Sequence, residues 1–279
     1  MKATLHCKWP LDVPTEFPRP VVIHVDCQKR TPKSPGVFDV LYLCEPKPIF
    51  PAMSAYAIKH PDLFDLIVVS SDHLLGASEK IVPLEYGTSW IPPDAAVPKK
   101  RPGVSLIVGR KHRTVGHRLR HTMWRRQDEI RIPKHFFVSD VGKPRRLTWL
   151  RGMLGRLDPL AANPWGWPVL GGSKLPLFES HYHLAIENCE SRFYFSEKLL
   201  DCFLTDTIPI YWGCRNIGEY FDLRGIRQAR TADGLIAACN AASEADYAAS
   251  REAIAENRRR AHTYLDLGAR LGALIASRL

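Results

Sequence analysis

Long apolar runs are missing from this sequence of 279 residues. A helix that crosses a bilayer needs about 20 consecutive apolar residues, and no stretch of the chain approaches that length. The first residues, MKATLHCKWPLDVP, contain no apolar core of the kind that a secretory signal requires. We therefore expect a cytoplasmic, globular protein with neither a signal peptide nor a transmembrane segment.

Paired cysteines are missing as well. The chain has seven cysteines, and none of them forms a CxxC pair or shows the spacing of metal ligands. An odd number without a pairing pattern favours reduced thiols over a disulfide framework. The cysteines therefore give no support for a zinc site; they stand at positions 7, 27, 44, 189, 202, 214 and 239.

Acidic residues are scarce relative to basic ones, 29 against 39, and the formal net charge is +10. The excess is concentrated in residues 101–151, which hold fourteen Lys or Arg and three acids. Such a segment attracts anions: nucleic acid, an anionic membrane surface or a nucleotide diphosphate. The sequence has no nucleic-acid module and no regular aromatic interleaving, so we expect no nucleic-acid partner. Peripheral membrane association through the basic surface stays open.

Short apolar runs alternate with helix-prone segments, which is typical of an α/β protein. A proline-rich linker at residues 92–103 separates two such series. We therefore expect an N-terminal α/β domain at residues 1–100 and a C-terminal domain, including a C-terminal helix, at residues 101–279. The expected strands are residues 21–25, 37–43, 66–70, 104–108 and 136–138, and the expected helices are residues 52–59, 116–126, 232–242 and 244–279.

The most informative stretch is residues 186–213, IENCESRFYFSEKLLDCFLTDTIPIYWG. Its pattern predicts a strand that ends at Glu187 and Asn188, a polar loop, a helix that begins near Ser196, and a second strand at residues 208–211. Strand, helix and strand in this order form the unit from which parallel sheets are built.

The start of the expected helix is a candidate anion site. Helix starts carry unpaired N–H groups and a positive dipole, and Ser196 is a favourable N-cap residue. An acid such as Glu197 is common in the first turn for that reason alone, but the dipole disfavours Lys198 there unless the lysine faces an anion. We therefore expect a diphosphate site at this helix start.

These motifs resemble the C-terminal signature of glycosyltransferase family 10, the alpha-1,3/4-fucosyltransferases. One departure is Asp206, where the family usually has a glycine. The matching residues stand in the family's order as Glu187-Asn188, Tyr194-Phe195-Ser196-Glu197-Lys198-Leu199 and Pro209-Ile210-Tyr211-Trp212-Gly213.

The resemblance implies a GT-B-like α/β fold, in which two Rossmann-like domains face a cleft and the C-terminal domain holds the nucleotide sugar. It implies that Glu197 binds the ribose hydroxyls and Lys198 the diphosphate. Animal members of the family carry a membrane anchor and stem, so this chain is expected to be bacterial-like or a shortened form of a longer protein. The donor-binding residues implied by the motif are Glu187, Asn188, Tyr194, Ser196, Glu197 and Lys198.

A second candidate segment is SLIVGRKHRTVGHRLRHTM at residues 105–123. The family has a comparable strand, basic loop and helix, whose arginine contacts the nucleotide phosphate, and a guanidinium suits phosphate oxygens. By this resemblance Arg120, or else Arg118, is a donor-binding residue; the alternative is that both are surface arginines of a helix. His117 and His121 are either phosphate donors or surface histidines, and we favour surface histidines.

Glu45 is the candidate catalytic base. It directly follows the apolar run at residues 37–43, at the place where a strand would end. Without the resemblance, a glutamate that opens a surface loop before Pro46 is the simpler interpretation. The family has a catalytic glutamate in a similar place, which favours catalysis, and Glu85 and Asp72 are the other candidates.

The expected function is therefore an inverting glycosyltransferase that passes L-fucose from GDP-fucose to a glycan hydroxyl. Family members need no metal for the step, and no DxD-like motif stands beside a strand, so no metal or other cofactor is expected. The alternatives are a related transferase that uses another nucleotide sugar such as GDP-mannose, a glycan-binding pseudo-enzyme, and a basic nucleic-acid-binding protein.

Overall fold

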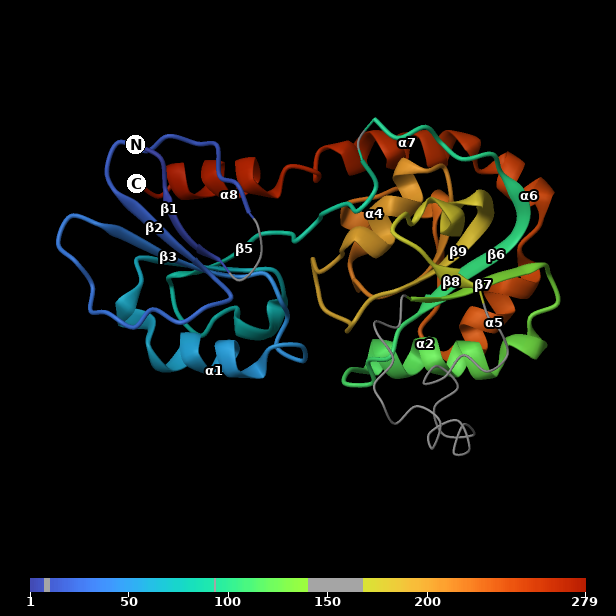
Figure 1. Ribbon diagram of the computed structural model, residues 1–279, viewed down its shortest axis with the longest axis horizontal. Helices are drawn as coiled ribbons and strands as arrows, with labels where there is room; N and C mark the ends of the chain where they lie inside the picture. Colours follow the sequence, from blue (N-terminus) through green and yellow to red (C-terminus); the bar gives the residue numbers. More distant parts are fainter. Residues whose placement is uncertain (8–10, 93, 140–167) are drawn as a thin grey trace.

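The computed structural model describes residues 1–7, 11–92, 94–139 and 168–279. They form two α/β domains, each built around a parallel sheet (Figure 1). Both ends of the chain lie on the first domain, because the last helix returns to it from the second. The predicted α/β class is confirmed.

The first sheet has five parallel strands among the described residues, in the order β1-β2-β3-β4-β5. Side chains of the inner strands β3 and β4 are buried throughout, as expected when both faces of a parallel sheet are covered. The elements of this part are β1 (Thr4–Cys7), β2 (Val21–Val25), β3 (Phe38–Leu43), α1 (Pro51–Lys59), β4 (Leu66–Val69) and β5 (Ile81–Pro83).

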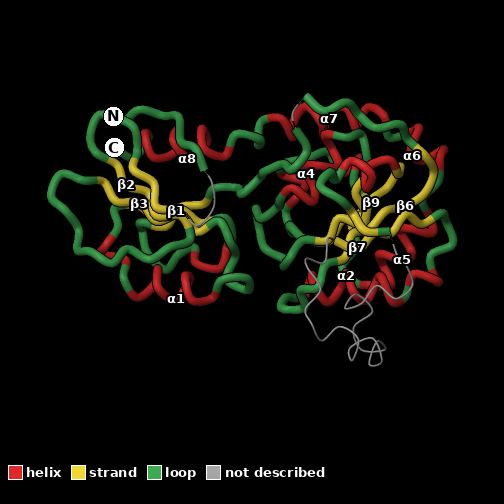
Figure 2. Tube along the Cα trace, in the orientation of Figure 1, coloured by secondary structure: helices red, strands yellow, loops and turns green. Residues whose placement is uncertain are grey.

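Helices from distant parts of the chain cover the two faces of this sheet (Figures 1 and 2). On one face, Met53 and Ala57 of α1 pack on β3 and β4. On the other face lies α8 (Leu267–Ala276), whose buried residues Leu267, Leu271 and Ile275 recur at intervals of four. This spacing places one apolar stripe of α8 against β2, β3 and β4.

The end of the chain differs from the expectation of helical structure throughout residues 244–279. It forms three helices, α6 (Glu244–Ala249), α7 (Arg251–His262) and α8, and Asp266 caps α8 by accepting a hydrogen bond from the Ala269 N–H at 2.8 Å. The C-terminal helix was expected in the second domain. It packs into the core of the first instead, because its apolar stripe fits that sheet.

The second sheet has six parallel strands among the described residues, in the order β11-β10-β9-β6-β7-β8. The predicted strands at residues 104–108 and 136–138 fall within β6 and β7. The elements are β6 (Arg101–Val108), α2 (Val115–Arg125), β7 (Lys134–Ser139), β8 (Val169–Leu170), β9 (Ser180–Ile186), α4 (Glu197–Leu204), β10 (Ile208–Trp212), β11 (Arg227–Gln228) and α5 (Ala232–Ala241). Short 3-10 helices lie at Pro61–Leu63, Asp72–Leu74, Gln127–Glu129, Leu175–Glu179, Ile217–Glu219 and Leu223–Gly225.

The strand order reverses between β6 and β9. From β6 the chain continues through α2 to β7 on one side, and from β9 it continues through α4 to β10 on the other. Helices α2 and α4 lie on opposite faces, because α2 packs in one core layer and α4 in the other. In open α/β sheets, ligands bind outside the carboxyl ends of the strands at such a switch point.

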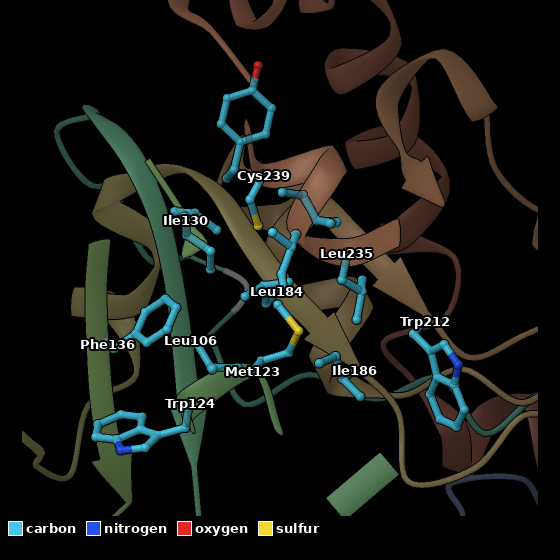
Figure 3. Close-up of a cluster of buried hydrophobic side chains, with 14 of the residues drawn as sticks. Leu106, Met123, Trp124, Ile130, Phe136, Leu184, Ile186, Trp212, Leu235 and Cys239 are labelled. Atoms are coloured by element: carbon cyan, nitrogen blue, oxygen red, sulfur yellow. The ribbon is translucent and has the colours of Figure 1, made fainter. Parts of the chain in front are cut away.

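Figure 3 shows the core layer between this sheet and α2 and α5. Leu106 of β6 and Leu184 of β9 point into it, and Met123 of α2 and Leu235 of α5 pack against them. Trp212, at the end of β10, is also buried in this layer, so its ring is a packing residue. This packed layer lies directly against β6 and β9, the two strands of the switch point.

None of the helices in the described ranges is long and apolar enough to span a bilayer.

Replacing Leu271 by alanine is expected to lower the free energy of unfolding by about 2–5 kcal/mol, because it leaves a cavity between α8 and the first sheet. Urea denaturation measures this loss. The matched control is Leu223→Ala, since Leu223 is 47% exposed and its truncation should change stability little. Equal stability of the two variants would show that α8 is not packed on the sheet.

Candidate functional site

The candidate site lies at the switch point of the second sheet, where the first turns of α2 and α4 meet the end of β9. The N–H of Gly116, in the first turn of α2, donates to the carbonyl of Asn188 at 3.2 Å. A Cβ at residue 116 would lie 1.7 Å from the Glu187 carbonyl oxygen. Only glycine permits this close approach of helix and strand.

Glu187 is a fully buried carboxylate that connects β9 to α4. Its two oxygens accept hydrogen bonds from the Ser196 N–H at 2.8 Å and the Ser196 hydroxyl at 2.7 Å. A Cβ at Gly213 would come within 2.5 Å of the Glu187 side chain, so the turn after β10 also closes on it. Burial raises the pKa of Glu187, and Lys198 opposes the rise. The carboxylate thereby fixes where α4 begins.

The first turn of α4 carries an ion cluster. The Ser196 hydroxyl caps the helix by accepting from the Lys198 N–H, and the Lys198 ammonium lies 2.8 Å from Glu197 and 3.8 Å from Glu187. Burial disfavours charge on Glu197, but Lys198 and then Lys174 outweigh it and lower the pKa of Glu197 to about 2. Glu197 and Glu187 in turn raise the pKa of Lys198 against its burial, so the cluster favours an ionised carboxylate and a charged ammonium.

Arg120 joins this cluster from α2. Its guanidinium donates to the Asn188 side-chain oxygen at 2.7 Å. Burial lowers its pKa, and the negative charges of Glu187 and Glu197 oppose that shift. Arg118 is exposed and donates to the Arg113 carbonyl at 3.3 Å, so only Arg120 of the two candidate arginines points to the switch point.

Lys174 is a member of the site that the motifs did not indicate. Burial lowers its pKa to about 8, while the charges of Glu197 and Asp201 oppose that shift, so its ammonium lies within electrostatic reach of α4. The same ammonium lies 2.9 Å from the centroid of the Trp90 ring, a cation–π arrangement. No sequence signal pointed to Lys174, because it precedes the short 3-10 helix before β9 rather than a motif.

Glu45 follows β3 at the carboxyl edge of the first sheet. Burial raises its pKa, Asp26 adds to the rise, and Lys198 and Lys111 of the second domain oppose it. These influences place the carboxyl within electrostatic reach of the α4 start. A half-buried glutamate with a raised pKa is suited to accept a proton.

The other candidate bases have structural partners. Asp72 accepts hydrogen bonds from the Ser191 hydroxyl and, at 3.3 Å, from Arg215, so it links the two domains. Glu85 lies 3.8 Å from Arg270 of α8. Neither interaction leads to the ion cluster of α4.

Of the donor-binding residues that the motif implied, Asn188 and Lys198 are partly exposed and Glu197 keeps 7% of its surface. Glu187, Tyr194 and Ser196 are buried behind them, where they support the exposed groups. The whole motif is thus brought together at one edge, and direct contact of each residue with a ligand stays a prediction.

The expectation for the two histidines of α2 was wrong. His117 and His121 are both buried. Thr114 and His117 form a capping box at the start of α2, and burial, followed by the charge of Arg120, lowers the pKa of His117 to about 3. His121 stacks on His112, with ring centroids 3.7 Å apart.

Part of the basic segment falls outside the description. Residues 140–151 belong to the ranges that the structure does not describe, so the charged side chains of the segment are located only as far as Ser139. Within the described ranges, no group of three or more His, Cys, Asp or Glu side chains is arranged to hold a metal ion. All seven cysteines are free thiols.

Comparison with known proteins gives a fold but no close relative. No protein-family model and no curated protein matches the sequence. Among solved structures, the chain is similar to an alpha1,3-fucosyltransferase with GDP-fucose, at 16% identity and a TM-score of 0.50, over 88% of this chain and 71% of that chain. HepE of Anabaena, in complex with UDP and glucose, matches at 11% identity and a TM-score of 0.60, over 93% of this chain and 78% of that chain.

A glycosyltransferase from Rickettsia africae is a third similar structure, at 12% identity and a TM-score of 0.55, over 92% of this chain and 76% of that chain. At these identities the likeness establishes the architecture alone. The predicted GT-B-like fold is therefore confirmed, and so is the resemblance to the fold of the fucosyltransferases.

Substitution of Gly116 by alanine is expected to lower the free energy of unfolding by about 1–3 kcal/mol, because the new Cβ forces α2 away from Glu187. The control is Gly172→Ala, where a Cβ meets nothing within 4 Å. Chemical denaturation of both variants checks the prediction. A Gly116→Ala protein as stable as the control would contradict the close contact between α2 and β9.

Proposed function

We propose that this protein is an inverting glycosyltransferase that transfers L-fucose from GDP-fucose to a hydroxyl group of a glycan. The observation that supports the proposal most is the ion cluster of Lys198, Glu197 and Arg120 at the switch point. It combines a helix start with two cations, which suits a diphosphate. A structure similar in fold is described with GDP-fucose.

In this proposal the donor diphosphate lies across the start of α4. Lys198 and Arg120 donate to its oxygens, and the Lys198 ammonium exchanges part of its contact with Glu197 for the phosphate. Glu197 is ionised at all physiological pH values, so it is an acceptor for the two ribose hydroxyls. Glu187 does not touch the donor, but it holds Ser196 and thereby the helix start.

The chemical step in the proposal needs one base and an anionic leaving group. Glu45 takes the proton of the acceptor hydroxyl while the oxygen attacks the anomeric carbon from the side opposite the diphosphate. The bond between the anomeric carbon and the phosphate oxygen breaks, and its electron pair leaves with GDP. Lys198 and Arg120 stabilise the charge that develops there, as preorganised positive groups do in other enzymes.

Charge stabilisation by protein side chains is the reason that the proposal includes no metal. Lys174 adds a third cation next to Glu197 and helps to hold the cluster near neutrality when the diphosphate binds. The metal-free step is part of the proposal and is tested by measuring transfer in the presence of a chelator.

A second candidate is a transferase that uses another nucleotide sugar. HepE, which is described with UDP and glucose, has a higher TM-score than the fucosyltransferase, 0.60 against 0.50. The diphosphate contacts would be the same for either donor, because they involve neither the nucleobase nor the transferred sugar. UDP therefore belongs beside GDP in the binding experiment, and transfer assays with GDP-mannose and GDP-fucose separate the two GDP-sugars.

The nucleotide is identified by calorimetric titration with GDP, UDP and CDP, and with a short DNA duplex as the test of the basic surface. We expect GDP to bind most tightly and the duplex to bind weakly and with a steep dependence on salt. Preferential binding of UDP would move the assignment to the second candidate. Tight binding of the duplex alone would overturn the transferase assignment.

The diphosphate site is tested by Lys198→Ala and Arg120→Ala. Each removes charge-assisted hydrogen bonds worth about 1.5–3 kcal/mol, so each should weaken GDP binding by about 10–100-fold. Arg118→Ala is the control on the same helix, because Arg118 is exposed and donates to the Arg113 carbonyl rather than to a residue of the ion cluster. If all three variants bind GDP with the affinity of the parent, the diphosphate does not lie at the start of α4.

Glu45→Gln is expected to leave GDP affinity unchanged and to lower the transfer rate by about 10²–10⁴, because the amide cannot accept the proton. A base acts only when deprotonated, so the parental rate should fall as the pH drops through the pKa of Glu45. Burial raises that pKa, which places the fall at a higher pH than for an exposed glutamate. Transfer rates of both proteins against pH, with GDP-fucose and a glycan mixture, provide the test. If the Glu45→Gln variant has the parental rate and pH profile, Glu45 is not the catalytic base.

A further inference from the structure

A pocket lies at the edge of the second sheet opposite the switch point. Its volume is about 770 Å³. Lys100 directly precedes β6, His181 lies at the start of β9, and Asp206 precedes β10, and all three line the pocket. Because the strands are parallel, these amino ends meet at one edge and are separated from the α4 start by the length of the strands. The pocket is therefore distinct from the donor site.

Both connections between the domains border this pocket. Val97 and Lys100 belong to the first connection, and His262 is the last residue of α7, just before the second connection leads to α8. Figure 1 shows α7 following α6 over the second domain and the chain continuing from it into α8 of the first domain. A ligand in the pocket would contact both segments that join the domains.

The charge of the pocket is predominantly positive. Arg251, Arg258 and Arg259 recur on one face of α7 and line it together with Lys100, against two acids, Asp206 and Glu244. The Arg258 guanidinium lies 3.4 Å from the Asp206 carboxylate, and Arg259 forms an ion pair with Glu256 at 2.9 Å. Arg251 is exposed, and none of the ion pairs found in the described ranges includes it.

Lys100 is the innermost cation. Its ammonium donates to the Phe178 carbonyl and to the Thr207 hydroxyl, both at 2.6 Å, and an ammonium has three donors. Both acceptors are neutral, and the ion pairs of the described residues include none with Lys100. Burial lowers the pKa of Lys100 to about 7, although Asp206 and Cys202 raise it. An anion near the remaining N–H would stabilise this charged group.

The rest of the lining suits a polyol. The ring of Tyr247 stacks on His181 with centroids 4.0 Å apart, and the pocket surface near them includes Ile254 and Val97. Flat rings and aliphatic groups pack against the C–H faces of a sugar, whereas the carboxylates of Glu244 and Asp206 accept hydrogen bonds from hydroxyl groups.

We propose that this pocket binds a phosphorylated polyol such as a sugar phosphate. The phosphate lies between Arg251, Arg258 and the ammonium of Lys100, where guanidinium groups offer paired donors to its oxygens. The hydroxyl groups of the polyol face Glu244 and Asp206. The proposal does not depend on the proposed transferase activity, since no residue of the pocket belongs to the α4 ion cluster.

The test is calorimetric titration of the full chain with glucose 6-phosphate, with inorganic phosphate and glucose as separate arms. We expect glucose 6-phosphate to bind more tightly than either. The variants Arg251→Ala and Arg251→Ala/Arg258→Ala should weaken its binding, the double variant by about tenfold or more. Arg224→Ala is the matched control, because Arg224 is exposed and does not line the pocket. Its guanidinium lies 2.7 Å from the Asp222 carboxylate.

Binding in the donor site is distinguished by Lys198→Ala, which should leave the affinity for glucose 6-phosphate unchanged. Thermal unfolding of the single variant Arg251→Ala should match that of the parent, since Arg251 is exposed. The proposal is overturned if glucose 6-phosphate does not bind, or if glucose alone binds as tightly as glucose 6-phosphate. It is also overturned if Lys198→Ala removes the binding and the α7 variants do not. Inorganic phosphate binding as tightly as glucose 6-phosphate would overturn the polyol part.

Discussion

The buried carboxylate of Glu187 is the constraint on which the rest of the site depends. A carboxylate with no exposed surface is costly unless hydrogen bonds and a cation compensate it. Here the Ser196 N–H and hydroxyl and, at 3.8 Å, Lys198 provide that compensation. These contacts determine where α4 begins and therefore where its free N–H groups point. Gly213 follows from the same constraint, because a Cβ there would collide with the Glu187 side chain, whereas Gly116 is required by the backbone carbonyl of the same residue.

Around that carboxylate the structure gathers a preorganised electrostatic site from separate elements. Arg120 comes from α2, Lys198 from α4 and Lys174 from the segment before β9, and they offset the charges of Glu187 and Glu197. A site with slightly more positive than negative charge binds an anion without a large reorganisation. Glu45 approaches from the other domain, and the return of α8 to the first sheet ties the two domains together. The chemistry proposed for this protein thus depends on domain placement as much as on the motif.

Local signals predicted most of the elements. The strands at residues 21–25, 37–43 and 66–70 and the helix at residues 232–242 were placed within a residue or two, because apolar runs and caps are local features. The assignment of α8 to the second domain was wrong, since an apolar stripe along a helix does not say which sheet it will pack against, and tertiary packing places it on the first. The burial of His117 and His121 was missed because the surfaces that cover a helix are set by tertiary packing and not by the sequence of the helix itself.

The sequence by itself determined the start of α4 and its charges, because Ser196, Glu197 and Lys198 are neighbours whose capping and ion pairing are fixed by helix geometry. It also determined the α/β class through the alternation of its apolar runs. Only the tertiary structure decided that Arg120 rather than Arg118 reaches the site and that Lys174 belongs to it. The physical reason is that burial and charge-to-charge distance depend on which surfaces pack together, and residues far apart along the chain carry no local record of that packing.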